Sequence, residues 1–273
     1  PEPMHFRRVL DHRLRRHAGA GLCRPPLHRH RRQCRFHDRR GPGERARGAL
    51  GAALVGVADV AQRLVEGRND YLLVDVRDAA ALKKAALDFM SRHGVPDIVI
   101  ANAGVVAIGV KDPLDEQVYR DIVDTNLNGV WHTIAATVPS MIRKGAGGSI
   151  VLTSSAQGLI GRGGDGSAAM FAYAAAKHGV VGLMRSAANA YAQHNIRVNS
   201  VHPTGVATPM IMNEFTITRI KENPKGSALS ANLLPVPYVE SEDVTNAVLW
   251  LVSSKARHVT GVTLPVDAGH TVM

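Results

Sequence analysis

The chain has 273 residues, of which 45% are hydrophobic and 4% aromatic, and its formal net charge is +10. This length and aliphatic composition suit one large α/β domain or two small ones, and the lack of any apolar run of about 18 residues excludes a membrane-spanning helix. The two cysteines, Cys23 and Cys34, lack the spacing of a metal site or a disulfide framework, so we expect no metal and a cytoplasmic location.

Residues 1–48 differ in composition from the rest of the chain. They contain 14 arginines, no lysine and four acidic residues, whereas the remaining residues carry 19 basic and 19 acidic side chains. The net charge therefore lies entirely in this segment, and the body of the protein is neutral. A nucleic-acid-binding protein spreads basic charge over a folded face, so no nucleic-acid partner is predicted.

We expect residues 1–48 to be an aberrant basic segment, translated out of frame or from a mis-assigned start. Arg, Pro, Gly, Ala and His without Lys is typical of an out-of-frame GC-rich gene, and the chain starts with Pro1 rather than Met. One alternative is a real arm that binds nucleic acid or an anionic surface, although it lacks interleaved aromatic residues to stack bases. The other is a mitochondrial-type presequence, although it has few serines.

Residues 49–273 are predicted to form a single domain in which strands and helices alternate. Short Val/Ile/Leu runs predict the strands, and longer Ala-rich or amphipathic stretches predict the helices. In chain order we expect a helix over 46–66, a strand over 70–76, a helix over 78–93, a strand over 96–104, an interrupted helix over 113–144, a strand over 148–155, a helix over 169–194, a strand over 196–203, a helix over 241–254 and a strand over 259–269.

Because the strands are continuous apolar runs, they predict a parallel sheet covered on both faces, a Rossmann-like doubly wound α/β fold. Residues 209–240 interrupt the alternation with mixed polarity and several prolines, which predicts a lid over a substrate site.

Small, polar and turn-forming residues follow each predicted strand. They are Asp75-Val76, Asn102-Ala103-Gly104, Ser154-Ser155 and Pro203-Thr204-Gly205-Val206. In an open α/β sheet, ligands bind beyond the carboxyl ends of the strands. The sequence therefore predicts a binding site at this end of the sheet.

Tyr173 and Lys177 form a candidate acid/base pair. They are four residues apart in an otherwise Ala-rich helix, so both lie on one helical face. A cation near the phenol favours the phenolate and lowers its pKa from about 10, while Ser155 could hydrogen-bond a carbonyl oxygen. Such a trio assists hydride transfer, which requires a cofactor. The alternative is a structural pair whose polar ends reach solvent.

Four motifs in chain order resemble those of the short-chain dehydrogenase/reductase family: "ANAG" (101–104), "TNLNGVW" (125–131), "SIVLTSSAQG" (149–158) and "YAAAK" (173–177). The resemblance covers about residues 55–273. It implies an NAD-dependent oxidoreductase with a Ser-Tyr-Lys mechanism, acting on a small-molecule alcohol or ketone.

The resemblance also implies a role for each matching residue. Tyr173 would be the general acid/base, Lys177 would lower its pKa and hold the nicotinamide ribose, and Ser155 rather than Ser154 would polarise the substrate oxygen. Asn126 would anchor a water that links Lys177 to solvent, or else it only kinks its helix. The implied cofactor-binding residues are Asp75, Val76, Asn102, Ala103, Gly104, Tyr173, Lys177, Pro203, Val206 and Thr208, while Thr204 replaces a more usual glycine.

Several longer strings, among them "YAAAKHGVVGLMRS" and "IRVNSVHPTGV", look most like the mycofactocin-associated or carveol-dehydrogenase-like branch of the family. This likeness implies NAD rather than NADP and a secondary alcohol that is terpenoid. The helices near 113–144 and 169–194 and the C-terminal strand resemble the surfaces through which the family forms homotetramers.

One element that the resemblance demands has no counterpart in the sequence. Residues 1–50 hold no TGxxxGxG turn between a first strand and a first helix, where backbone N–H groups would bind the pyrophosphate. The acidic residue expected after the second strand is missing too. We therefore expect the first βαβ part to be missing or aberrant, with low stability or weak NAD binding. The alternative function is a catalytically impaired remnant that keeps the fold.

Overall fold

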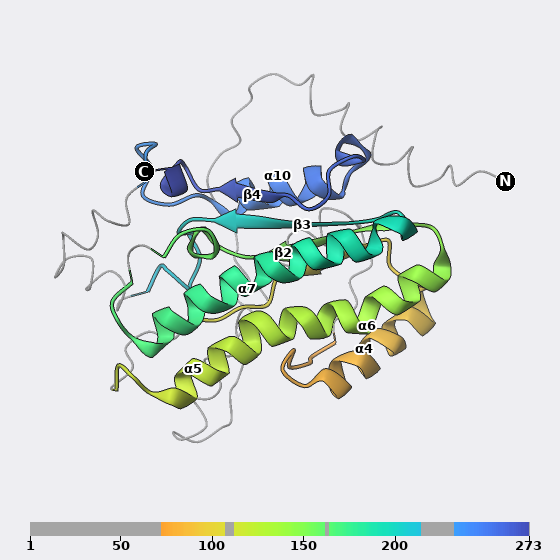
Figure 1. Ribbon diagram of the computed structural model, residues 1–273, viewed down its shortest axis with the longest axis horizontal. Coiled ribbons are helices and arrows are strands. Elements are labelled where there is room, and N and C mark those ends of the chain that lie inside the picture. Colours follow the sequence, from red (N-terminus) through yellow and green to blue (C-terminus); the bar gives the residue numbers. More distant parts are fainter. Residues whose placement is uncertain (1–71, 107–111, 162–163, 214–231, 273) are drawn as a thin grey trace, which may run out of the picture. The chain divides into compact units, whose positions relative to one another are not determined.

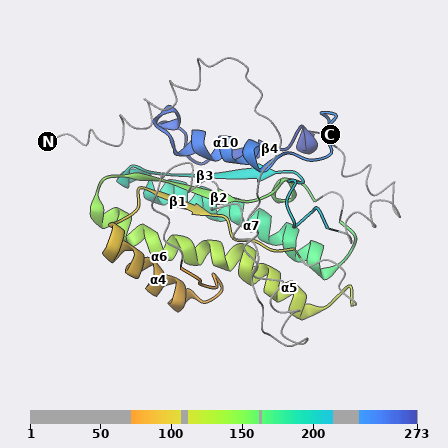
Figure 2. The same ribbon diagram turned by 180° about the vertical axis from the view of Figure 1, so that it is seen from behind.

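The computed structural model describes residues 72–106, 112–161, 164–213 and 232–272. Within them, β1 (Ile98–Ala101), β2 (Gly148–Thr153), β3 (Ile196–Pro203) and β4 (Thr263–Val266) form one parallel sheet in that order (Figures 1 and 2). Strands β2 and β3 are buried over most of their length, which explains why their sequences are continuous apolar runs. The predicted segment 1–48 and the predicted helix 46–66 lie outside the described residues.

Helices α6 (Gly129–Lys144) and α7 (Ala168–Tyr191) cover one face of the sheet (Figures 1 and 2). In α7 the spacing of Val180, Met184 and Ala188 places one apolar stripe toward the strands. The core on this face consists of buried aliphatic side chains, among them Val99, Ile134, Met141, Ile150, Leu152, Val180, Met184 and Val198.

Helix α10 (Ser241–Val252) covers the opposite face, where Val248 and Leu251 pack against Val151 and Val201. Helix α4 (Ala79–His93) lies beside α6. Helices on both faces of a parallel sheet confirm the Rossmann-like doubly wound class. Short 3-10 turns complete the elements: η3 (Ala156–Gly158), η4 (Ala192–His194), η5 (Ser254–Ala256) and η6 (His270–Val272).

The predicted interruption of the helix over 113–144 is confirmed. Helix α5 (Glu116–Val123) starts after Asp115, whose carboxylate accepts hydrogen bonds from the N–H groups of Gln117 and Val118. A π-helical turn, η2 (Asp124–Asn128), then joins α5 to α6. Single π-helical turns inside α-helices occur frequently at functional sites.

The predicted strand over 70–76 is wrong for residues 72–76, which are irregular and end in a turn. Asp78 then caps α4 by accepting a hydrogen bond from the N–H of Ala81. A strand needs a neighbour to pair its backbone N–H and C=O groups. Among the described residues, β1 pairs with β2 alone, so none offers residues 72–76 a ladder.

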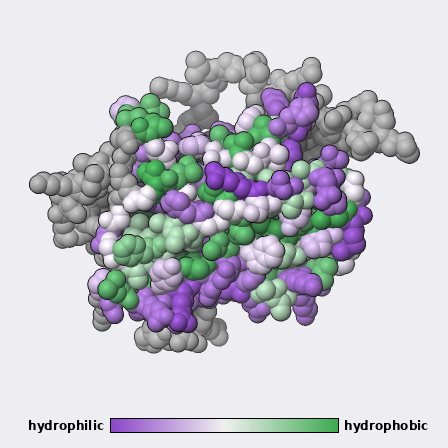
Figure 3. Space-filling view, viewed as in Figure 1, coloured by the Kyte–Doolittle hydropathy of each residue, from purple (hydrophilic) through white to green (hydrophobic). Residues whose placement is uncertain are grey.

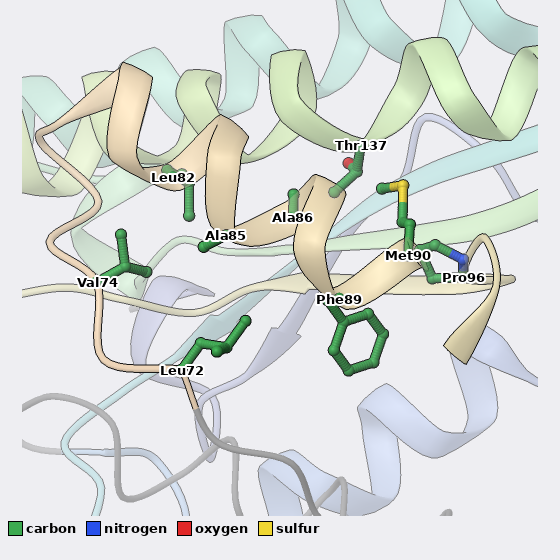
Figure 4. A pocket seen from close by; sticks show the side chains of 9 residues that line it. All are labelled: Leu72, Val74, Leu82, Ala85, Ala86, Phe89, Met90, Pro96 and Thr137. Atoms are coloured by element: carbon green, nitrogen blue, oxygen red, sulfur yellow. The ribbon is translucent and has the colours of Figure 1, made fainter. Parts of the chain in front are cut away.

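An apolar pocket of about 210 Å³ lies between α4 and the segment that precedes it (Figure 4). Its lining consists of Leu72, Val74, Leu82, Ala85, Ala86, Phe89, Met90, Pro96 and Thr137. No residue of α4 is fully buried, and Leu73 nearby is 98% exposed. The pocket lacks titratable side chains and every predicted site residue, so it is separate from the predicted catalytic site.

The remaining predicted elements differ from the structure mainly at their ends. The apolar runs over 96–104 and 259–269 shorten to the four-residue strands β1 and β4. Most of the predicted lid, residues 214–231, lies outside the described residues. Within the described part of the chain, no helix is long and apolar enough to cross a membrane.

Candidate active site

The predicted site residues converge at the carboxyl ends of the parallel strands. Asn102, Ala103 and Gly104 follow β1, Ser154 and Ser155 follow β2, and Thr204 to Thr208 follow Pro203 at the end of β3. Since parallel strands end at the same edge of the sheet, the topology brings segments about 50 residues apart into one region.

Helix α7 carries Tyr173 and Lys177 to this edge. Ser167 caps the helix by accepting a hydrogen bond from the N–H of Met170. The Nζ of Lys177 lies 5.6 Å from the centre of the Tyr173 ring, as the i, i+4 spacing predicts. Lys177 is only 3% exposed, and its Nζ donates a hydrogen bond of 2.8 Å to the main-chain oxygen of Thr153.

Burial shifts the pKa values of both groups. It lowers the pKa of Lys177 to about 8, and it raises the pKa of Tyr173 above its ordinary value, while a side-chain hydrogen bond with Ser155 opposes that rise. The sequence predicted a lowered Tyr173 pKa. The structure gives a raised one, because the loss of water around the phenolate outweighs the stabilisation it receives from its neighbours.

The two adjacent serines have different partners. Ser154 is buried, and its hydroxyl donates a hydrogen bond of 2.8 Å to the main-chain oxygen of Lys177. Ser155 caps the turn η3, its Oγ accepting from the N–H of Gln157, and it also meets the phenol of Tyr173. The Ser154 hydroxyl thus ties β2 to α7, whereas the Ser155 hydroxyl faces the reacting group that the sequence predicted for it.

Asn126 lies in the π-helical turn η2 and is fully buried. Its Oδ1 accepts from the N–H of Val105 at 2.7 Å, and its Nδ2 donates to the carbonyl of Val105 at 2.8 Å. Both ends of the amide are therefore occupied in holding the chain that follows Gly104. A carboxamide has a second N–H and a second lone pair besides these two bonds, and the predicted role as a water anchor stays a prediction.

Gly104 occupies a position where a side chain would not fit easily. A Cβ there would lie 3.3 Å from Oδ1 of Asn126 and 3.4 Å from Nζ of Lys177. Asn102 accepts a hydrogen bond of 2.8 Å from the hydroxyl of Thr153, which joins the ends of β1 and β2. The predicted Asn102-Ala103-Gly104 turn thus lies directly beside the lysine and asparagine of the site.

Asp75 and Val76 precede α4, and Val76 packs against the start of α6. Arg77 forms an ion pair of 2.7 Å with Asp75 and lowers the pKa of that carboxyl. The ring Nδ1 of His132 donates to the main-chain oxygen of Val76 at 2.8 Å. These two contacts hold the turn at Asp75 and Val76 in place. The Asp75 carboxylate is paired with Arg77, and its predicted contact with the cofactor stays a prediction.

The segment after β3 is held by main-chain and hydroxyl contacts. Pro203 pairs with Val266 in the sheet, and Val206 forms a parallel bridge with Val239. The hydroxyl of Thr204 donates to Oδ1 of Asn232, and that of Thr208 to the carbonyl of Val206. Pro203, Val206 and Thr208 therefore share the edge of the sheet with Tyr173, and their cofactor contacts stay predictions.

Sequence reasoning missed the buried His202 and Ser200 in β3. The Nδ1 of His202 lies 2.9 Å from the main-chain oxygen of Ser155, and its Nε2 lies 2.8 Å from Oγ of Ser200. A signal existed, because "IRVNSVHP" places serine and histidine inside an otherwise buried strand, where polar side chains need partners.

The sequence and the fold resemble those of known proteins. The family described as enoyl-(acyl carrier protein) reductase matches residues 51–271. An uncharacterized oxidoreductase of Mycobacterium tuberculosis (strain CDC 1551 / Oshkosh) is 51% identical over 199 residues, covering 71% of this chain and 70% of the relative. The (-)-trans-carveol dehydrogenase of Rhodococcus erythropolis is 47% identical over 216 residues, or 76% of each chain.

A solved structure of similar fold is that of carveol dehydrogenase from Mycobacterium avium in complex with NAD. It matches with a TM-score of 0.70 and 43% sequence identity, covering 81% of this chain and 80% of that one. All predicted site residues lie within the matched part of the family.

Proposed function

Because the chain belongs to the short-chain dehydrogenase/reductase family, we propose that it is an NAD-dependent oxidoreductase that interconverts a secondary alcohol and its ketone. The observation that carries the proposal is the meeting of Ser155, Tyr173 and Lys177 at the carboxyl end of the sheet. Each of these side chains has a chemical property that the reaction needs.

In ketone reduction, the hydroxyls of Ser155 and Tyr173 hydrogen-bond the substrate oxygen and polarise the carbonyl. The phenol then passes its proton to that oxygen as it becomes an alkoxide. The raised pKa of Tyr173 keeps the phenol protonated at neutral pH, which suits this direction. In alcohol oxidation the same group must accept the proton, so we expect that direction to be favoured by alkaline conditions.

Lys177 contributes a cation close to the phenol while pH stays below its pKa of about 8. A positive charge near the ring stabilises the phenolate that remains after proton transfer. The hydrogen bond to the Thr153 carbonyl holds the ammonium in place. The positive charge is therefore already in position beside the Tyr173 phenol before each proton transfer.

The residues present fit the nicotinamide half of NAD. The ammonium of Lys177 has three donors, and Thr153 takes one, which leaves two without a partner in the described part of the chain. Two such donors suit the neighbouring hydroxyls of a ribose. Because Gly104 has no side chain, the space beside the Lys177 ammonium stays free of atoms from that residue. Val206 and Thr208 would contact the carboxamide of the nicotinamide. The dinucleotide supplies the hydride when it is bound.

The fit is incomplete for the pyrophosphate. The sequence before residue 50 has no TGxxxGxG turn, and residues 1–71 lie outside the described part of the chain. The alternative function therefore stays open as a second proposal: a catalytically impaired remnant that keeps the fold and binds the cofactor weakly.

A terpenoid substrate is the finer proposal. Support comes from the two carveol dehydrogenases among the similar proteins. Apolar side chains also lie exposed on the chain after β3, at the same end of the sheet as Ser155: Met210, Met212, Leu233 and Leu234. They would contact a hydrocarbon skeleton better than a sugar. The link to mycofactocin and the cytoplasmic location stay predictions.

A homotetramer is also proposed. Figure 3 shows hydrophobic residues spread among hydrophilic ones over the face where α6 and α7 lie. Trp131 in α6 is 48% exposed and Phe171 in α7 is 60% exposed. Large exposed aromatic side chains are typical of surfaces that bind another protein.

The proposed activity can be tested by following NADH absorbance across a panel of secondary alcohols that includes carveol. Turnover that disappears in a Tyr173→Phe variant supports the proposal. Turnover that survives this change contradicts the role of Tyr173, and no turnover by the intact chain on any alcohol favours the impaired remnant.

A further inference from the structure

His202 and Ser200 form a buried polar pair that the proposed reaction does not use. Both are fully buried in β3, and their side chains lie 2.8 Å apart. A buried histidine in a sheet costs free energy unless both ring nitrogens find partners. We therefore expect each ring nitrogen of His202 to have a hydrogen-bond partner.

The hydrogen bonds define the protonation of the ring. The Nδ1 of His202 contacts the main-chain oxygen of Ser155 at 2.9 Å, and a carbonyl only accepts, so Nδ1 carries the proton. Burial lowers the pKa of His202, so the ring is neutral and Nε2 accepts from the hydroxyl of Ser200. Ser200 thereby selects the tautomer that donates to Ser155.

Ser155 lies just beyond the part of β2 that pairs in the sheet. The ladder between β2 and β3 ends at Thr153 and Val201, and the N–H of Ser154 makes one more bond to Val201. The carbonyl of Ser155 accepts from the N–H of Gly158 within its own turn and from His202. Among the described residues, the ring of His202 is thus the group that connects the Ser155 carbonyl to the distant strand β3.

We propose that His202, oriented by Ser200, is a positioning residue that fixes the backbone of Ser155 so that its hydroxyl meets Tyr173 and the substrate oxygen. This inference rests on the proposed function, in which Ser155 binds that oxygen. A small displacement of a catalytic hydroxyl is enough to slow a reaction strongly, because the hydrogen bond depends on distance and angle.

Three variants test the proposal in turnover. His202→Leu removes both ring contacts and should lower kcat by about 10-fold to 100-fold while leaving the KM for NAD nearly unchanged. His202→Asn keeps a donor where Nδ1 lies and should restore most of the rate. Val201→Ala creates a cavity in the same strand on the opposite face and should lower stability but not kcat. A loss in His202→Leu no larger than in Val201→Ala, or no recovery in His202→Asn, would overturn the proposal.

A titration tests the positioning without any turnover. The Ser155 hydrogen bond lowers the pKa of Tyr173, so a displaced Ser155 should raise the pH at which the Tyr173 phenolate forms. Ultraviolet difference titration, with the matching Tyr173→Phe variants subtracted, should show this rise in His202→Leu but not in Val201→Ala.

An unchanged titration in a folded His202→Leu protein contradicts the positioning role even if the protein turns over no alcohol. Conversely, a shifted titration without turnover supports it while the proposed function fails. If His202→Leu does not fold, Ser200→Ala should give a smaller shift in the same direction, and the absence of any shift there contradicts the role.

Discussion

The ammonium of Lys177 donates a hydrogen bond of 2.8 Å to the main-chain oxygen of Thr153, so helix α7 is bound to the end of strand β2. The hydroxyl of Ser154 makes the reciprocal connection to the main chain of Lys177. These two bonds fix α7 and β2 relative to each other where Tyr173 and Ser155 meet.

Replacing Tyr173 with phenylalanine should abolish proton transfer but preserve the fold. The ring packs against the cluster of Val105, Ile122, Ala169 and Ala172, and phenylalanine keeps these contacts. We expect kcat to fall by about 10²-fold to 10⁴-fold with little change in Tm. Steady-state kinetics and thermal unfolding on the same preparations measure both, and a large fall in Tm would mean that the phenol is structural.

The adjacent serines provide a matched pair. Ser155→Ala should lower kcat/KM by about 10²-fold to 10³-fold, because it removes a donor to the substrate oxygen. Ser154→Ala should leave kcat nearly unchanged but destabilise the protein by about 1 kcal/mol, because it removes the bond to Lys177. Urea unfolding and kinetics separate the two effects, and the reverse pattern would show that the reacting serine has been assigned wrongly.

Lys177 should make stability depend on pH in a defined window. Burial lowers the pKa of Lys177 to about 8 in the folded protein, whereas the unfolded chain keeps the ordinary lysine pKa of 10.5. Between these values the unfolded state binds more protons, so the free energy of unfolding rises as pH rises.

A Lys177→Met variant lacks this contribution. The difference in unfolding free energy between the wild type and Lys177→Met should move in favour of the wild type by about 2 kcal/mol from about pH 7 to about pH 9.5. Urea unfolding at the two pH values measures it. A difference that stays constant would mean that the lysine keeps its proton throughout.

NAD binding by the 273-residue chain should be weak, with a Kd in the millimolar range. The sequence before residue 50 offers no glycine-rich turn to place N–H groups and a helix N-terminus against the pyrophosphate. Isothermal titration should give similar affinities for NAD and for nicotinamide mononucleotide, since the nicotinamide half provides most of the contacts. Micromolar binding of NAD, well above that of the mononucleotide, would refute this prediction.

The sequence by itself was enough to determine the class of fold and the order of the reacting groups. Continuous Val/Ile runs alternating with helices predict a parallel sheet, and residues that follow such strands must gather at one edge. The spacing of Tyr173 and Lys177 is likewise a local property of a helix. The strand over 70–76 failed because pairing depends on a neighbour, which a local pattern does not reveal.

Only the tertiary structure decided how the groups act on one another. Burial raises the pKa of Tyr173, although a lysine one helical turn away had predicted the opposite. Both ends of the Asn126 amide are used by Val105, and His202 contacts Ser155 across 47 residues of chain. Desolvation and contacts between distant segments arise only when the chain packs, so no spacing in the sequence could specify them.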